Sequence, residues 1–183
     1  MSGKMNLKPF YQTIGYMVAV HVLCLLAMTL CRVILVLSNT PVEGIDWSLL
    51  LTAMVIGVKF DNLIACFMGA APIAFLTIWS ICLMDKPFYG EWMKKAITGV
   101  EWYMSVVYAV LLFVGVADAR YYMFFENHLN ISVTEWFGFV GDTAGMVFGD
   151  KLNLVFLAIA VALILAYIGA LKAIGNRYKK TLL

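Results

Sequence analysis

Charged residues are scarce in this chain, since Asp, Glu, Lys and Arg make up 13% of the 183 residues against 63% apolar residues. So small a charged fraction leaves too few polar side chains to cover the surface of a water-soluble domain. Basic runs are also lacking, because no stretch holds more than two consecutive Lys or Arg and the net charge is only +2. These shortages exclude nucleic acid as a partner and indicate a protein whose surface faces lipid.

Metal-ligating residues are few and scattered. The chain has four cysteines and two histidines, with no CxxC pair and no cluster of histidines. The cysteines all fall in apolar stretches, where a thiol is most often buried as a small hydrophobic side chain. No Thr lies among the Asp, Glu and His residues that a metal-dependent phosphotransfer site needs. We therefore predict no catalytic residue, no metal site and no cofactor within this chain.

Apolar residues are gathered into runs long enough to cross a bilayer. A helix needs about 20 apolar residues to span about 30 Å of hydrocarbon. Such runs cover 13–31, 62–83, 99–117 and 152–171, and only one charged residue, Glu101, lies inside them. The pattern predicts an all-α integral membrane bundle, a single transmembrane domain over 1–183. Its four transmembrane helices are expected at about 11–37, 60–83, 99–120 and 151–172.

The segment 47–83 is ambiguous because, as one helix, it would measure about 55 Å, too long for one crossing and too short for two. We expect a short interfacial helix over about 48–58, followed by the crossing helix from Phe60. The alternative is a helical hairpin that crosses twice. Lys59 and Asp61 favour the first version, since a hairpin would place both near the centre of the bilayer.

The distribution of Lys and Arg predicts the orientation, because cytoplasmic loops carry the positive excess. With the N-terminus inside, nine of the 13 Lys and Arg residues fall on the cytoplasmic side, whereas eight of the 11 acidic residues fall outside. We therefore predict a multi-pass protein of the cell membrane, the inner or cytoplasmic membrane, with both termini cytoplasmic.

Charged residues recur where the predicted helices reach the outer leaflet. Ionisable groups at this depth usually pair with one another or line a polar cavity. One interpretation pairs Asp61 with Arg120, or Lys59 with Asp118, and so fixes helices together. The other gives a remaining cation to a phospholipid headgroup. The candidates for helix pairing or headgroup contact are Arg32, Lys59, Asp61, Asp118 and Arg120.

Aromatic residues accompany these charges, as is typical of a membrane interface. The loop that follows mixes aromatic residues with glycines, a composition that predicts an interfacial helix over about 133–140. The candidate interface aromatics are Tyr121, Tyr122, Phe124, Phe125 and Trp136.

Two motifs carry a resemblance to a known family. Gly57-Val58-Lys59-Phe60-Asp61 opens the second crossing, and Ala117-Asp118-Ala119-Arg120-Tyr121-Tyr122 closes the third. Together with Phe124 and Phe125, these residues resemble the N-terminal membrane region of the lipoteichoic acid synthase family. Its members are membrane phosphoglycerol or phosphoethanolamine transferases of the alkaline phosphatase and sulfatase superfamily. The resemblance covers most of the chain at the level of helix order.

The resemblance implies about five helices followed by an extracytoplasmic catalytic domain. That domain would use a Thr nucleophile and Mn²⁺ or Zn²⁺ to transfer a phospholipid headgroup. The present sequence holds four predicted helices and no such domain. We therefore expect either a fragment of the enzyme or a stand-alone relative of its anchor, with the catalytic domain supplied in cis or in trans.

Two classes of function remain. The first is the membrane-anchoring module of a phospholipid-headgroup transferase, with the bilayer as its other partner. The second is an independent small integral membrane protein, either an accessory scaffold or a transporter-like bundle. A transporter is expected to carry charges near the bilayer midplane, often in repeated halves, and the sequence has no visible repeat. This favours the first class.

Overall fold

A computed structural model of the protein describes residues 8–40, 46–83, 86–130, 145 and 148–182. Four long helices make up nearly all of this part of the chain, and the same residues include no strand. The all-α fold expected from the sequence is therefore confirmed. The predicted interfacial helix at 133–140 lies outside the described residues, as does Trp136.

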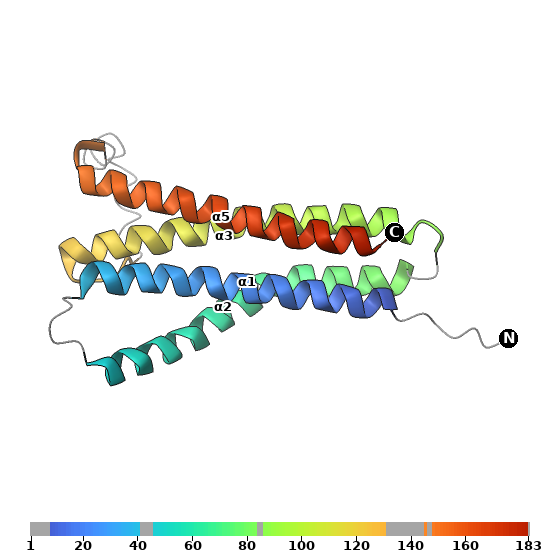
Figure 1. Cartoon of the computed structure of the whole chain (residues 1–183), viewed down its shortest axis with the longest axis horizontal. Coiled ribbons are helices and arrows are strands. Elements are labelled where there is room, and N and C mark those ends of the chain that lie inside the picture. Colours follow the sequence, from blue (N-terminus) through green and yellow to red (C-terminus); the bar gives the residue numbers. More distant parts are fainter. Residues whose placement is uncertain (1–7, 41–45, 84–85, 131–144, 146–147, 183) are drawn as a thin grey trace.

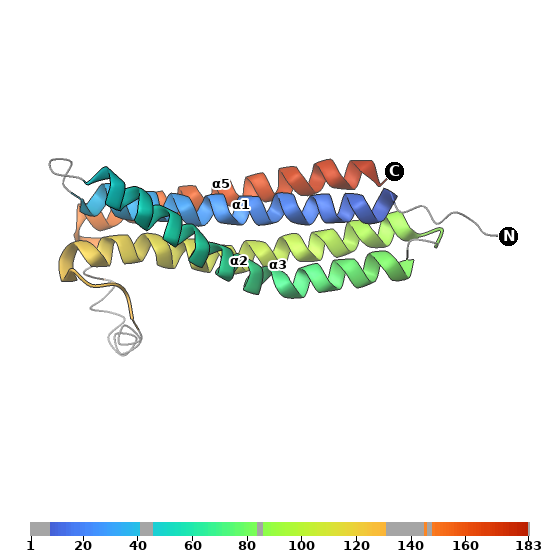
Figure 2. The same cartoon turned by 90° about the horizontal axis from the view of Figure 1, so that it is seen from below.

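The helices run in alternating directions (Figure 1). α1 begins and α5 ends at one end of the bundle, which we call the proximal end (Figures 1 and 2). α1 ends and α5 begins at the opposite, distal end. Their bounds are α1 Lys8–Asn39, α2 Trp47–Leu83, α3 Tyr89–Phe125 and α5 Lys151–Thr181.

Each helix is long and apolar enough to cross a membrane. Their outward faces carry large apolar side chains that water would not tolerate, such as Leu26, Phe67 and Leu165, each more than half exposed. Lipid tails can cover these faces at no cost, which is why the same residues are ordinary on a membrane helix. The helices extend beyond the predicted bounds, α1 and α3 at both ends, α2 at its start and α5 at its end.

α2 is one unbroken helix of 37 residues, so the predicted split into an interfacial helix at 48–58 and a crossing helix from Phe60 is wrong. The hairpin alternative is wrong for the same reason. Asp61 does not end the helix because Arg32 of α1 neutralises it. Lys59 lies on the exposed surface, from which a long side chain can extend toward the interface. The first half of α2 diverges from α1 toward its start (Figure 1).

The core is a set of narrow helix faces rather than a broad apolar interior. α1 contributes Tyr16, Val20 and Cys24, which recur at intervals of four residues and are buried. Within the described part of the chain, four polar or charged residues are buried with the apolar ones: Thr13, Asp61, Ser80 and Glu101. A buried carboxylate in a membrane helix is costly unless it is paired, so the partners of Asp61 and Glu101 identify the sites that the fold has to satisfy.

Candidate functional site

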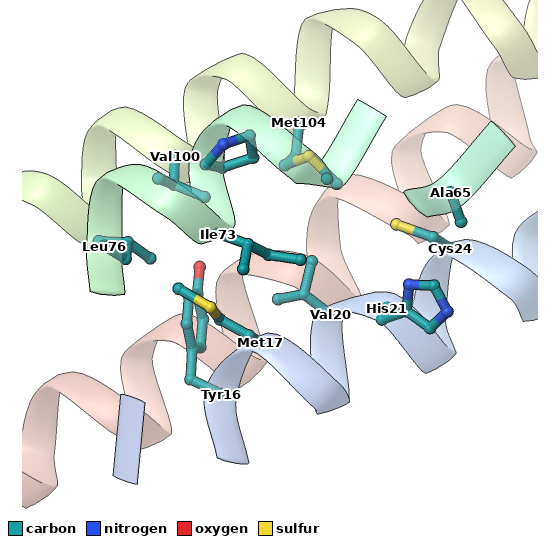
Figure 3. Close-up of a pocket in the computed structure, with 12 residues that line it drawn as sticks. Tyr16, Met17, Val20, His21, Cys24, Ala65, Ile73, Leu76, Val100 and Met104 are labelled. Atoms are coloured by element: carbon teal, nitrogen blue, oxygen red, sulfur yellow. The ribbon is translucent and has the colours of Figure 1, made fainter. Parts of the chain in front are cut away.

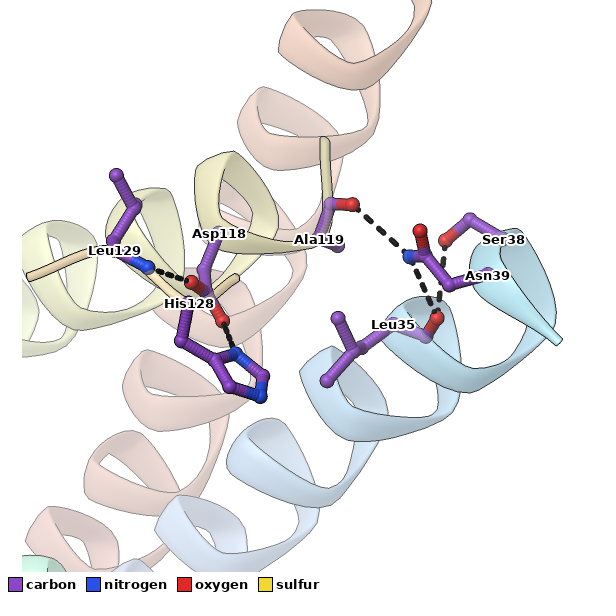
Figure 4. Close-up of polar contacts among 7 residues, drawn as sticks. All are labelled: Leu35, Ser38, Asn39, Asp118, Ala119, His128 and Leu129. Carbon is purple, nitrogen blue, oxygen red and sulfur yellow. Dashed lines mark hydrogen bonds and ion pairs between the residues drawn. The ribbon is translucent and has the colours of Figure 1, made fainter. Parts of the chain in front are cut away.

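Asp118 of α3 fixes the chain that leaves this helix at the distal end. α3 ends at Phe125 and is capped by Glu126, whose left-handed conformation (φ 50°) turns the backbone and whose N–H donates to the carbonyl of Tyr122. The turn brings the next residues back to Asp118 (Figure 4). Its carboxylate accepts 2.6 Å from the Leu129 N–H and lies 2.8 Å from Nδ1 of His128. Asp118 therefore ties residues 128–129 to the side of α3.

Arg120, two residues further along α3, fixes the chain that enters α5. Its Nε donates to Asn153 and its Nη2 donates to Asp150, each at 2.6 Å. Its guanidinium also lies 4.0 Å from the centre of the Phe124 ring, within the range of a cation–π contact. Asp150 in turn caps α5, because its carboxylate accepts from the Leu152 N–H. One arginine thus joins the end of α3 to the start of α5.

The Asp150 carboxylate is stabilised in its charged form. The hydrogen bond from the Leu152 backbone N–H holds the pKa of this carboxyl below its ordinary value, and the Arg120 guanidinium lowers it further. Both effects require α5 to begin where it does. The ionised carboxylate is therefore part of the distal structure at neutral pH.

α1 joins the same end of the bundle through Asn39. Its side-chain amide donates 3.0 Å to the carbonyl of Ala119, the residue between Asp118 and Arg120, and also 3.0 Å to the carbonyl of Leu35 (Figure 4). We call Asn39, Asp118, Arg120 and Asp150, with the backbone at 128–129, the distal clamp. It connects three helices and holds the chain on both sides of the connection between α3 and α5.

A separate ion pair joins α1 to α2. Nη2 of Arg32 donates 2.9 Å to Oδ1 of Asp61, whose side chain is almost fully buried. The guanidinium packs over Gly57, in the space that a Cβ at this position would occupy. The Gly57 of the sequence motif therefore has a steric role, which is to leave room for the arginine that neutralises Asp61.

The predicted ion pairs are wrong in their partners. Asp61 bonds to Arg32 rather than Arg120, and Asp118 bonds to the 128–129 segment rather than Lys59. The sequence placed these charges at one end of the bundle but could not give the rotation of each helix about its axis. His128 and Asp150, which complete the clamp, were not among the predicted residues. In the sequence, only their positions within a few residues of a helix end could have indicated that they belong to the clamp.

The aromatic residues at this end contact one another and the clamp. Tyr121 stacks on Phe125 with ring centres 4.5 Å apart, and the Tyr122 ring lies 4.9 Å from that of His128. Phe124 and Phe125 are more than half exposed. Such rings suit an interface in which one face is buried in lipid and an edge stays wet.

Glu101 is the second buried carboxylate and lies in the proximal half of the bundle. Lys179 of α5 donates 2.8 Å to its Oε2. The sequence showed Glu101 as the single charge inside an apolar run, but gave no partner for it. Among the residues that the structure describes, no three His, Cys, Asp or Glu side chains come together as a group able to hold a metal ion.

Four apolar crossing helices with buried ion pairs define an α-helical, multi-pass membrane protein. Comparison with protein-family models, with curated proteins and with solved structures finds no match for this chain.

Proposed function

We propose that the chain is the membrane-anchoring module of a lipoteichoic acid synthase-like transferase that moves a phosphoglycerol headgroup from a phospholipid. The distal end faces the outside of the cell membrane, and both termini are cytoplasmic. The catalytic domain, with its Mn²⁺ or Zn²⁺, is supplied in cis or in trans. The bundle anchors this domain and holds the surface on which it rests.

The observation that carries this proposal is the distal clamp. Asp118 and Arg120, which belong to the motif that resembles the family, hold the two ends of the connection between α3 and α5. Both ends of this connection are held by part-buried hydrogen bonds to charged side chains, and we take this as support for a partner on the distal side. A docking surface for a second domain benefits from fixed loop ends, because a mobile loop would lose conformational entropy when the domain binds.

The charges support the orientation. The Lys and Arg residues that flank the proximal end, Lys86, Lys94, Lys95, Lys172, Arg177, Lys179 and Lys180, exceed the acidic residues there. The distal end holds most of the acids. Cytoplasmic loops carry the positive excess, so the proximal end is assigned to the cytoplasm.

The contacts of the distal cations show which of them remain candidates for binding a lipid headgroup. Arg32 and Arg120 each have a carboxylate partner, and the Arg120 side chain is only 12% exposed. Lys59 lies exposed on α2. We therefore assign Arg32, Asp61, Asp118 and Arg120 to helix and loop pairing, and keep Lys59 as the candidate for contact with a lipid phosphate.

The test is to delete the chain from its natural host and follow transfer of labelled phosphoglycerol from phosphatidylglycerol in isolated membranes. We expect transfer to fall, and to return when the chain is restored. An Asp118→Ala variant should restore the membrane level of the protein but only part of the transfer, because the clamped loop is released. Lys59→Ala tests the headgroup contact in the same assay. Unchanged transfer in the deletion strain would refute the proposal and favour an independent scaffold or transporter-like protein.

A further inference from the structure

A polar pair lies on the outer surface of the bundle, halfway along its length. Nε2 of His21 on α1 donates 2.9 Å to Oδ1 of Asn62 on α2, and this hydrogen bond is exposed. His21 is next to Val22, the middle residue of the apolar run 13–31, and Asn62 lies three residues from the middle of α2. The pair is therefore near the bilayer midplane, where an exposed polar group is expensive.

Asn62 keeps hydrogen-bonding capacity that His21 does not use. An amide side chain has two N–H donors, and its oxygen has two lone pairs. His21 occupies one lone pair, and no residue in the described part of the chain accepts from Nδ2 of Asn62. Thr52 and Thr98, which are also exposed, are satisfied within their own helices, because each donates to the carbonyl four residues earlier. The Asn62 amide has no such partner in its own helix.

The surroundings of the pair do not supply the missing partner. A cavity lies beside it between α1, α2 and α3, and His21 is one of the residues that line this cavity (Figure 3). Its lining includes Val20, Ala65 and Ile73, whose side chains have no hydrogen-bonding group. Lipid tails have none either, and headgroups lie about 15 Å from the midplane. A polar side chain of another membrane helix can complete the amide.

The surface of α2 beside Asn62 allows another helix to approach closely. Cys66 and Ala70 follow Asn62 at intervals of four residues, so the three side chains lie on one side of the helix, and all three are exposed. We call these three residues the Asn62 face. Small side chains let the backbones of two membrane helices come close, which brings polar groups on the two helices within hydrogen-bonding distance.

We propose that the Asn62 face binds a second copy of this chain, related by a twofold axis along the membrane normal. A copy inserted in the same orientation presents its own Asn62 at the same depth. The amide is self-complementary, because Nδ2 of each copy can donate to Oδ1 of the other on the lone pair that His21 leaves free. His21 also holds the amide in place before association, which lowers the entropy cost of binding.

Lys59 limits where the two α2 helices cross. It is exposed one turn before Asn62, so a crossing at this level would bring two like charges together. The crossing point is therefore between Asn62 and Ala70, from which the two helices diverge toward their distal ends. The Lys59 side chain can then extend toward the membrane interface.

The native thiol of Cys66 provides the test. A disulfide forms only when the two Cα atoms are within about 7 Å, so Cys66 can be crosslinked across the proposed interface. The matched control is Cys82, which is also exposed on α2 but lies about 160° around the helix from Cys66. Two forms of the full chain, with tags of different length, are expressed together, and the isolated membranes are oxidised with copper phenanthroline. The products are separated without reducing agent.

We expect a crosslinked dimer that contains both tags in the wild type and in Cys82→Ala, and none in Cys66→Ala. Asn62→Leu should lower the initial rate of crosslinking about tenfold, because two hydrogen bonds between helices are lost. Thr52→Val is the matched control, since its hydroxyl is already bonded within α2, and it should keep the wild-type rate.

Ala70→Leu is a second interruption, because Asn62→Leu also removes the bond to His21 and can disturb the fold, as judged by circular dichroism. It adds bulk to an exposed position of the Asn62 face and leaves the His21–Asn62 pair intact. It should slow crosslinking as well.

The proposal is overturned if no dimer forms in the wild type, or if Cys66→Ala and Cys82→Ala give equal amounts of it. It is also overturned if the product joins the chain to a different protein, or if a folded Ala70→Leu protein keeps the wild-type rate. The experiment follows a crosslinked mass rather than headgroup transfer, so its failure is distinguishable from failure of the anchor function.

Discussion

The Glu101 carboxylate lies against the backbone of Gly175, in the space where any other residue would place its Cβ. The same carboxylate accepts from Lys179 at 2.8 Å, one turn further along α5. Glycine at 175 therefore lets α3 and α5 approach closely enough for a buried ion pair to form.

Gly175→Ala is expected to displace Glu101 and weaken its bond to Lys179. Overpacking of this kind costs about 1–3 kcal/mol, and loss of the buried pair adds to it. The measurement is thermal unfolding in detergent, followed by circular dichroism. Gly169→Ala is the matched control on the same helix, because a Cβ at 169 meets no atom within 4 Å. Equal melting temperatures for the two variants would contradict the steric role of Gly175.

The Arg32–Asp61 pair is expected to behave as a unit. Arg32→Met leaves the buried Asp61 carboxylate without a partner and should cost about 3–5 kcal/mol. Asp61→Leu leaves the partly exposed Arg32 guanidinium unpaired and should cost less. The double variant should be more stable than either single variant, because no unpaired charge remains. A double-mutant cycle measured by unfolding in mixed micelles checks this. Additive losses would mean that the two side chains do not compensate each other in the membrane.

The start of α5 is expected to respond to acid. Because the pKa of Asp150 is lowered in the folded protein, its contribution to stability is fully present above the ordinary carboxyl value. The contribution is lost as the pH falls through the lowered pKa. Amide exchange at Leu152 and Leu154 should therefore be constant from neutral pH down to the ordinary carboxyl range, after correction for the intrinsic rate, and faster below it. Asp150→Asn should remove this dependence, and an unchanged acid response in that variant would assign it to another group.

The orientation can be checked with single added thiols. Asn127→Cys lies exposed just beyond α3 at the distal end, and Thr181→Cys lies exposed at the proximal end of α5. An impermeant maleimide should label Asn127→Cys in intact cells and should reach Thr181→Cys only after permeabilisation. The reverse pattern would invert the topology and place the distal clamp in the cytoplasm.

The helices were predictable from the sequence because each apolar run had to cross a fixed thickness of hydrocarbon. The continuity of α2 was not, because it depends on Arg32 arriving from another helix to neutralise Asp61. In the sequence, the charges of Lys59 and Asp61 indicate that one helix ends and the crossing helix starts near Phe60. In the structure, Asp61 is tolerated inside the helix because it is paired with Arg32. Lys59 is tolerated because its side chain is exposed on the surface of α2.

The candidate site was predictable only in outline. Composition and helix order placed Arg32, Asp61, Asp118 and Arg120 at one end of the bundle. The structure places Asp118 and Arg120 near the distal end of α3, whereas Asp61 lies near the middle of α2. Their partners depend on helix rotation and on where α3 turns at Glu126, which a hydrophobic pattern does not encode. The pairing of Lys179 with Glu101 could not be predicted, because the two residues are 78 positions apart in the sequence.

The alternation of the four helices also constrains what can be attached to them. α1 begins and α5 ends at the same end of the bundle (Figure 1). A polypeptide extending past α5 therefore emerges beside the first turn of α1. It reaches the side of the distal clamp only after an odd number of additional crossings.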